Sequence, residues 1–139
     1  MAYQRKTWQQ KLHNGTQPKV EIADKKFGDV PMGATMFVGT PEIVEAYIRN
    51  IPAGVHTNLQ QMRKDLAADN NAEYSCPITA GIFLRIVAEA AYEEYIAGKS
   101  IKKIAPFWRM IDRKAAVVKK LTFGTELIAE QRAKEGLQF

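Results

Sequence analysis

The sequence has few of the residues that cross-link a chain or bind a metal. Among its 139 residues there is one cysteine, Cys76, and there are two histidines, His13 and His56. A single thiol excludes an internal disulfide, and three such side chains so far apart in the sequence do not predict a zinc site. We therefore expect no metal and no other cofactor, and a chain suited to a reducing compartment.

Long apolar runs are also missing. No stretch approaches the roughly 18 to 20 apolar residues that cross a bilayer, and the first ten residues lack the apolar core of a secretion signal. The prediction is a cytoplasmic protein with no membrane partner. With 46% hydrophobic residues, the chain is long enough for one core and too short for two.

Positive charge is concentrated in one segment of the chain. The formal net charge is +5, and residues 99–120 hold eight lysines and arginines against one acidic residue, Asp112. Such a block can be a solvated face or a surface that binds a polyanion. The aromatic side chains of Phe107 and Trp108 within the block favour nucleic acid.

Residues 1–39 predict an irregular N-terminal arm packed over the core. Trp8 and Leu12 fall on one face of a short helical turn, but prolines and glycines in residues 18–33 interrupt any longer pattern. Residues 40–139 are expected to form the main domain.

Two helices open the main domain. Thr40 is a capping residue and Pro41 suits the first helical position, and this helix should end before Pro52. Thr57 and Gln60 have capping-box spacing and predict the start of the second helix.

A third helix is predicted after a polar loop at residues 69–74. Ser75 or Cys76 caps it, Pro77 opens it, and Gly98 ends it. Two helices joined by a short polar loop have the outline of a helix-turn-helix.

The pattern changes after Gly98. Residues 106–111 and 115–121 have the composition of two short strands on either side of a charged turn, which would form a wing. Residues 125–135 predict a last helix that closes on Gly136. The predicted fold is α+β, mainly helical and winged-helix-like.

Three pieces of sequence occur in an informative order: IPAGVHT at residues 51–57, IAPFWRMI at residues 104–111, and a stretch at residues 124–136 that ends in KEG. They resemble the C-terminal domain of the O6-alkylguanine-DNA alkyltransferases. The first is similar to the Ile-Pro-x-Gly-x-x-Thr start of that family's helix-turn-helix. The second is similar to its active-site segment Pro-Cys-His-Arg-Val-Ile, and the third to its closing helix. The resemblance implies a winged-helix domain that binds DNA.

The departures from the family pattern bear on activity. Phe107 stands where the family has its alkyl-accepting cysteine, Trp108 stands where it has a histidine, and Arg109 is retained. Neither Phe107 nor Trp108 is a nucleophile or a base, so alkyl transfer is not expected here. Asn58 stands in place of the family's tyrosine after the threonine, and Gly81 lies near the position of its base-replacing arginine.

The chain also resembles the alkyltransferase-like proteins, because both lack the acceptor cysteine. These replace the acceptor cysteine with tryptophan, bind alkylated DNA and pass the lesion to other repair factors, although the tryptophan lies one residue later in this chain. The resemblance implies a non-catalytic DNA-binding protein whose partners are duplex DNA, which can be alkylated, and other repair proteins.

The expected contacts with DNA come from helix starts and from the basic segment. They are Thr57, Asn58, Thr79, Lys102, Lys103, Arg109, Arg113 and Lys114. Plain capping explains Thr57 and Asn58 equally well. A structural salt bridge is the alternative for Arg109.

Two further sites leave alternatives open. Phe107 and Trp108 either line a pocket for an extruded base or belong to the core under the wing. Cys76, at a helix N-terminus, is either a reactive thiol or an ordinary residue at a helix start. The competing functions are a protein-interaction module on the same fold and a thiol enzyme that uses Cys76.

Overall fold

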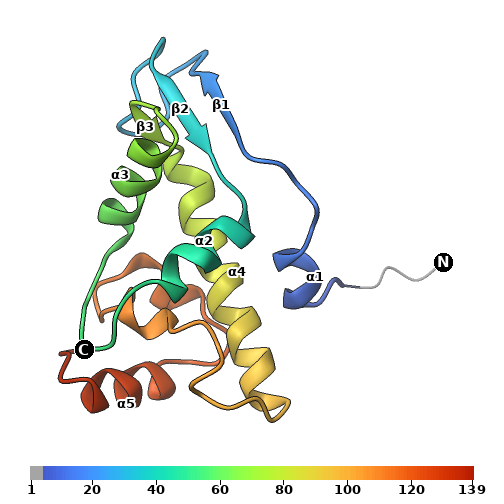
Figure 1. The fold of residues 1–139 in the computed structure, drawn as a ribbon, viewed down its shortest axis with the longest axis vertical. Coiled ribbons are helices and arrows are strands. Elements are labelled where there is room, and N and C mark those ends of the chain that lie inside the picture. Colours follow the sequence, from blue (N-terminus) through green and yellow to red (C-terminus); the bar gives the residue numbers. More distant parts are fainter. Residues whose placement is uncertain (1–4) are drawn as a thin grey trace.

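The computed structural model describes residues 5–139. Five α-helices, two 3₁₀ helices (η1 and η2) and a three-stranded sheet are formed (Figure 1). In chain order they are α1 (Trp8–Leu12), β1 (Lys19–Ile22), β2 (Thr35–Val38), α2 (Pro41–Arg49), α3 (Leu59–Asp69), β3 (Tyr74–Ser75), α4 (Pro77–Ile96), η1 (Phe107–Arg109), η2 (Ala116–Lys120) and α5 (Glu126–Lys134). The predicted α+β, mainly helical class is confirmed.

Several predicted helix boundaries are confirmed. The Thr40 hydroxyl accepts a hydrogen bond from the backbone N–H of Ile43 at 3.2 Å, and Pro41 is the first residue of α2. Pro77 likewise opens α4. Gly98 and Gly136 follow the ends of α4 and α5 with φ angles of 108° and 75°, a conformation that glycine adopts without steric cost.

The predicted capping box at the start of α3 is wrong by one residue. Asn58 is the cap, and its Oδ1 accepts a hydrogen bond from the backbone N–H of Gln61 at 2.8 Å. The Thr57 N–H instead donates to the carbonyl of Arg109 at 2.9 Å. Thr57 therefore ties the loop before α3 to η1, a long-range bond that local spacing does not reveal.

The N-terminal segment is not irregular, because it contributes two of the three strands. β1 and β2 pair antiparallel, with Val20 opposite Phe37, and β3 pairs parallel with β2. The sheet lies at one end of the molecule and α5 at the other, with α4 running between them (Figure 1). β3 comes from the loop between α3 and α4, so the partners meet only after the helices pack.

The predicted wing is wrong. Residues 107–109 and 116–120 form 3₁₀ helices, and the sheet formed within residues 5–139 comprises β1, β2 and β3 only. The physical reason is that neither segment has the alternating exposure of a wing strand, since residues 106–111 are almost wholly buried and the exposed residues of η2 are Ala116, Lys119 and Lys120. Phe107, Ile111 and Val117 are at most 7% exposed, whereas a wing strand would have one face in water.

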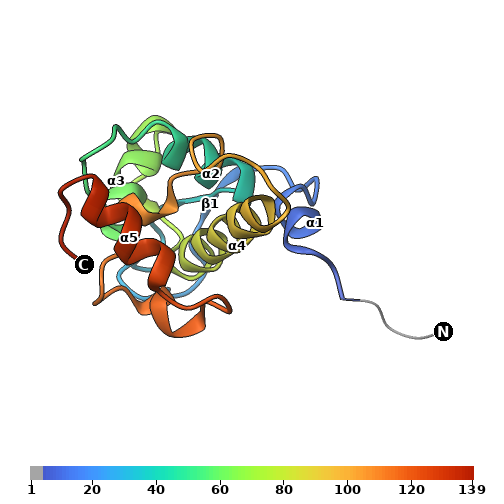
Figure 2. The same ribbon diagram turned by 90° about the horizontal axis from the view of Figure 1, so that it is seen from below.

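α4 is the central element of the core. Ile86, Val87, Ala88 and Ala90 are at most 9% exposed, and α1, α2 and α3 pack around the helix (Figure 2). A second, smaller apolar cluster lies under the sheet and includes Cys76. Among the described helices, none is both long enough and apolar enough to span a membrane.

Candidate functional site

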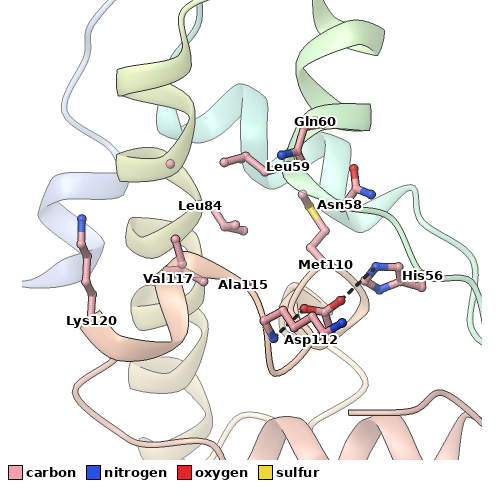
Figure 3. A pocket seen from close by; sticks show the side chains of 13 residues that line it. His56, Asn58, Leu59, Gln60, Leu84, Met110, Asp112, Ala115, Val117 and Lys120 are labelled. Atoms are coloured by element: carbon pink, nitrogen blue, oxygen red, sulfur yellow. Dashed lines mark hydrogen bonds and ion pairs between the residues drawn. The ribbon is translucent and has the colours of Figure 1, made fainter. Parts of the chain in front are cut away.

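A cavity of about 420 Å³ opens between the start of α3, the first half of α4 and the segment after η1 (Figure 3). Three parts of the chain that are distant in sequence therefore meet at one place. The lining residues are His56, Asn58, Leu59, Gln60, Gly81, Leu84, Met110, Asp112, Lys114, Ala115, Ala116, Val117 and Lys120.

The inner walls of the cavity are apolar and its rim is polar. Leu59, Leu84, Met110 and Val117 form the walls. A Cβ atom built on Gly81 would lie 3.9 Å from Leu59 Cδ2, which is ordinary contact distance, so the missing side chain of Gly81 leaves usable space in the wall. The combination of apolar walls and a few polar groups is typical of a small-molecule or base-binding site.

The orientation of His56 on the rim is fixed by a buried arginine. Arg132 is 3% exposed, and its Nη1 donates to the Trp108 carbonyl at 2.8 Å and lies 3.1 Å from His56 Nδ1. A guanidinium only donates hydrogen bonds, so Nδ1 must accept and the imidazole proton must be on Nε2. Burial lowers the pKa of Arg132, although the nearby carboxylates of Asp112 and Glu135 oppose this effect.

Asp112 faces the free nitrogen of His56. Its Oδ1 accepts the backbone N–H of Lys114 at 3.0 Å, which holds the carboxylate in place, and its Oδ2 lies 4.0 Å from His56 Nε2. That separation is longer than a direct hydrogen bond. His56 Nε2–H and Asp112 Oδ2 therefore face each other as a long donor–acceptor pair at the rim of the cavity, joined by a dashed line in Figure 3.

Phe107 and Trp108 are both buried, but Trp108 also lines a separate cavity with Lys102 and Arg109. Phe107 is 0% exposed, and Trp108 is 4% exposed and donates from Nε1 to Glu135 Oε2 at 2.6 Å. Neither lines the cavity described above, which Met110 reaches instead. Buried in this way, the Phe107 ring offers no free face on which a base could stack.

Arg109 has a structural role in this conformation. Its Nε donates to Glu135 Oε1 at 2.9 Å, and its Nη1 donates to the Ile51 carbonyl at 2.7 Å. Burial alone would raise the pKa of Glu135, but hydrogen bonds from Arg109, the Gly54 N–H and Trp108 outweigh burial and hold that pKa below its usual value. Arg109 thus joins η1 to Glu135, which follows α5, and to the loop after α2.

The other predicted DNA contacts do not form one surface. Asn58 and Lys114 line the cavity, and the Arg113 guanidinium lies 4.5 Å from the centre of the Phe139 ring. Thr79 is half-buried in the first turn of α4.

Lys102 and Lys103 belong to a different part of the surface. Both are exposed, and Lys102 lines a second cavity with Arg49 and Lys134. The segment that carries the two lysines runs beside α2, and residues 112–120 lie on the other side of α5 (Figure 2). The basic block of the sequence is therefore divided between two faces.

Cys76 is covered. Its side chain packs in the cluster under the sheet with Ala23, Val30 and Met36, and the residue is 6% exposed. Within residues 5–139, no three His, Cys, Asp or Glu side chains lie close enough together to hold a metal ion.

Sequence reasoning missed the two polar groups that define the rim. His56 lies inside the IPAGVHT piece, and Asp112 is the single acidic residue of the basic block, so both had a detectable signal. Their proximity depends on Arg132 and on the path of residues 110–114, which local patterns do not encode.

A scan against models of protein families, a search of curated proteins and a search of solved structures return no match to this chain. The cavity and the side chains around it are thus the observations from which a function can be proposed.

Proposed function

We propose that this chain is a non-catalytic DNA-binding protein of the alkyltransferase-like type, which holds an extruded, alkylated base in the cavity between α3, α4 and residues 110–120. The observation that carries this proposal is the composition of the cavity wall. His56 belongs to the first piece of sequence that resembles the alkyltransferases, Asn58 follows that piece, and Met110 belongs to the second. The fold thus brings both pieces to one cavity.

The shape and polarity of the cavity suit a base. A nucleobase has two apolar faces and a polar edge, and the cavity offers Leu59, Leu84 and Val117 to the faces and a polar rim to the edge. Apolar contact with these walls favours a base that enters the cavity, and a damaged base requires less energy to leave the duplex. Preference for a damaged base follows from these two terms.

The rim also carries cations that can contact the DNA backbone. Lys114 and Lys120 line the cavity and are exposed, and Lys119 is exposed beside them on η2. We assign the phosphate contacts to this group. Lys102 and Lys103, which lie on the other face, are not assigned to the same contact.

A passive role follows from the chemistry of the residues present. The position of the family's acceptor cysteine is taken by the buried side chain of Phe107, which is not a nucleophile. The one thiol of the chain, Cys76, is covered under the sheet. Incubation with alkylated DNA should therefore leave the mass of the protein unchanged.

Filling the cavity tests the proposal. Affinity would be measured for a duplex with one O6-methylguanine and for the same duplex unmodified. The wild type should bind the modified duplex more tightly, and Gly81→Phe should remove that preference by placing a ring in the cavity. Gly81→Ala is the matched control, because its methyl group meets only ordinary contacts and alanine favours the helix by about 1 kcal/mol. Equal affinity of the wild type for both duplexes would refute the proposal.

Salt dependence checks the assignment of the phosphate contacts in the same experiment. Each phosphate contact contributes about 0.9 to the slope of log K against log salt concentration. Lys114→Ala with Lys120→Ala should lower the slope by about 1.8. Lys102→Ala with Lys103→Ala is the control pair from the other face and should leave it unchanged. If only the Lys102 and Lys103 substitutions lowered the slope, the phosphate contacts would have to be assigned to the other face.

A further inference from the structure

The rim of the cavity presents a hydrogen-bond donor and an acceptor whose identities are fixed by the protein. The donation from Arg132 to His56 Nδ1 at 3.1 Å leaves Nε2–H as the free group of His56. The backbone N–H of Lys114 engages Asp112 Oδ1 at 3.0 Å and leaves Oδ2 as the free acceptor. Neither group can rotate to exchange its role without breaking one of these bonds.

We propose that His56 and Asp112 determine which alkylated base the cavity accepts, by selecting a base edge on which a ring-nitrogen acceptor lies beside an amino group. This inference rests on the proposed function. His56 Nε2–H would donate to the ring nitrogen, and Asp112 Oδ2 would accept from the amino group. Their separation of 4.0 Å leaves both groups free to bond to one ligand edge.

The two common classes of O-alkylated base differ on this edge. Alkylation at O6 of guanine removes the proton from N1, so the edge presents the N1 acceptor beside the 2-amino donor. Alkylation at O4 of thymine removes the proton from N3, so the edge presents two acceptors, N3 and O2. The second acceptor would face the Asp112 carboxylate, and two acceptors cannot form a hydrogen bond. The cavity should therefore take the alkylated guanine and reject the alkylated thymine.

A single substitution converts the acceptor into a donor while retaining the local structure. In Asp112→Asn, the Lys114 N–H holds the amide oxygen where Oδ1 lies now, so the amide nitrogen takes the place of Oδ2. The rim would then present two donors, which complement the two acceptors of the alkylated thymine. A base that leaves a polar group of the rim without a hydrogen-bond partner binds much more weakly than a base that satisfies both groups.

The test measures the affinity of wild type and Asp112→Asn for three duplexes of one sequence, carrying O6-methylguanine, O4-methylthymine or no modification. The wild type should prefer the first over the second by roughly tenfold or more, and Asp112→Asn should lose or reverse that preference. Equal melting temperatures of the two proteins would show that the Lys114 turn is intact.

The outcomes separate the two proposals. If the wild type binds neither modified duplex better than the unmodified one, the proposed function fails. If it binds both modified duplexes better than the unmodified one and Asp112→Asn leaves their ratio unchanged, the function stands and the role of His56 and Asp112 is refuted. A reversed ratio supports both proposals.

Discussion

Glu135 is the residue on which three segments of the chain meet. Its carboxylate accepts hydrogen bonds from Trp108 Nε1 at 2.6 Å, from Arg109 Nε at 2.9 Å and from the backbone N–H of Gly54 at 2.8 Å. These donors come from η1 and from the loop after α2, and Glu135 itself follows α5. The side chains of Glu135 and Arg109 are only 13% and 16% exposed, so water replaces few of these bonds if they are lost.

Replacing Glu135 tests this connection. Glu135→Gln keeps the shape of the side chain but removes the charge that pairs with Arg109 and replaces one acceptor oxygen with an NH2 donor, and we expect a loss of about 2 to 3 kcal/mol in the free energy of unfolding. Urea denaturation measures the change. Glu130→Gln, which removes an exposed ion pair with Lys134 one turn earlier, should cost less than about 0.5 kcal/mol. Equal effects of the two substitutions would contradict the assigned role of Glu135.

At the scale of elements, α1 is held on α4 by a carboxylate at its N-terminus. Glu93 of α4 accepts the backbone N–H groups of Trp8 and Gln9 at 3.0 and 3.1 Å, and the Gln9 amide donates to the Ala90 carbonyl at 2.8 Å. The first N–H groups of a helix have no partner within the helix, so an acceptor from a neighbouring helix stabilises it. A helix of five residues depends on such contacts, because it is too short to be stable alone.

Removal of the carboxylate should release α1 locally. In Glu93→Ala, the amides of residues 8–12 should exchange with solvent about fivefold faster, as expected for the loss of a helix cap worth about 1 kcal/mol, with little change in the amides of α4. Hydrogen exchange measured residue by residue reports both. Glu42→Ala is the control, since it removes an exposed pair with His13 at the other end of α1. Unchanged exchange in α1 would show that its apolar contacts suffice.

At the scale of the whole molecule, three carboxylates link folding to pH. A hydrogen bond from Arg63 lowers the pKa of Asp29, and hydrogen bonds from Tyr47 and Gln61 lower that of Asp65. The pKa of Glu135 is lowered as well, against the effect of its burial. Each carboxylate binds a proton more weakly in the folded chain than in the unfolded chain. Their contribution to stability is therefore complete above the ordinary carboxyl pKa values and is lost as the pH falls.

Acid should accordingly weaken the fold. The urea midpoint should decrease from about pH 5 downward and continue to decrease below about pH 3. Glu135 should contribute more to this change than Asp29, since Asp29 is 59% exposed and its ion pair is screened by water. The difference in stability between wild type and Glu135→Gln should therefore narrow as the pH falls. A constant difference across this range would show that the charge of Glu135 does not stabilise the fold.

The sequence by itself determined boundaries of three of the helices. Thr40 with Pro41, Pro77 and the glycines at positions 98 and 136 fix the boundaries of α2, α4 and α5 through capping and backbone conformation, which are local effects. The α+β class was predicted as well, but from two strands at residues 106–111 and 115–121 that do not form, whereas the strands of the structure are β1, β2 and β3.

Only the tertiary structure decided the strands and the cavity. β1, β2 and β3 are at most four residues long, and β3 pairs with β2 across α2 and α3, so their hydrogen bonds have no local signature. The apolar run around Phe107 fits a strand or a buried turn equally well from its pattern, and in the folded chain it has no strand beside it and forms a 3₁₀ helix.

The same holds for the site. Asn58 and Lys114 were recognisable from helix capping and charge, whereas His56 and Asp112 gained their roles only when packing brought Arg132 and the turn at Lys114 against them. Hydrogen bonds between residues far apart in the sequence set the direction in which each side chain donates or accepts, and those directions exist only in the folded chain.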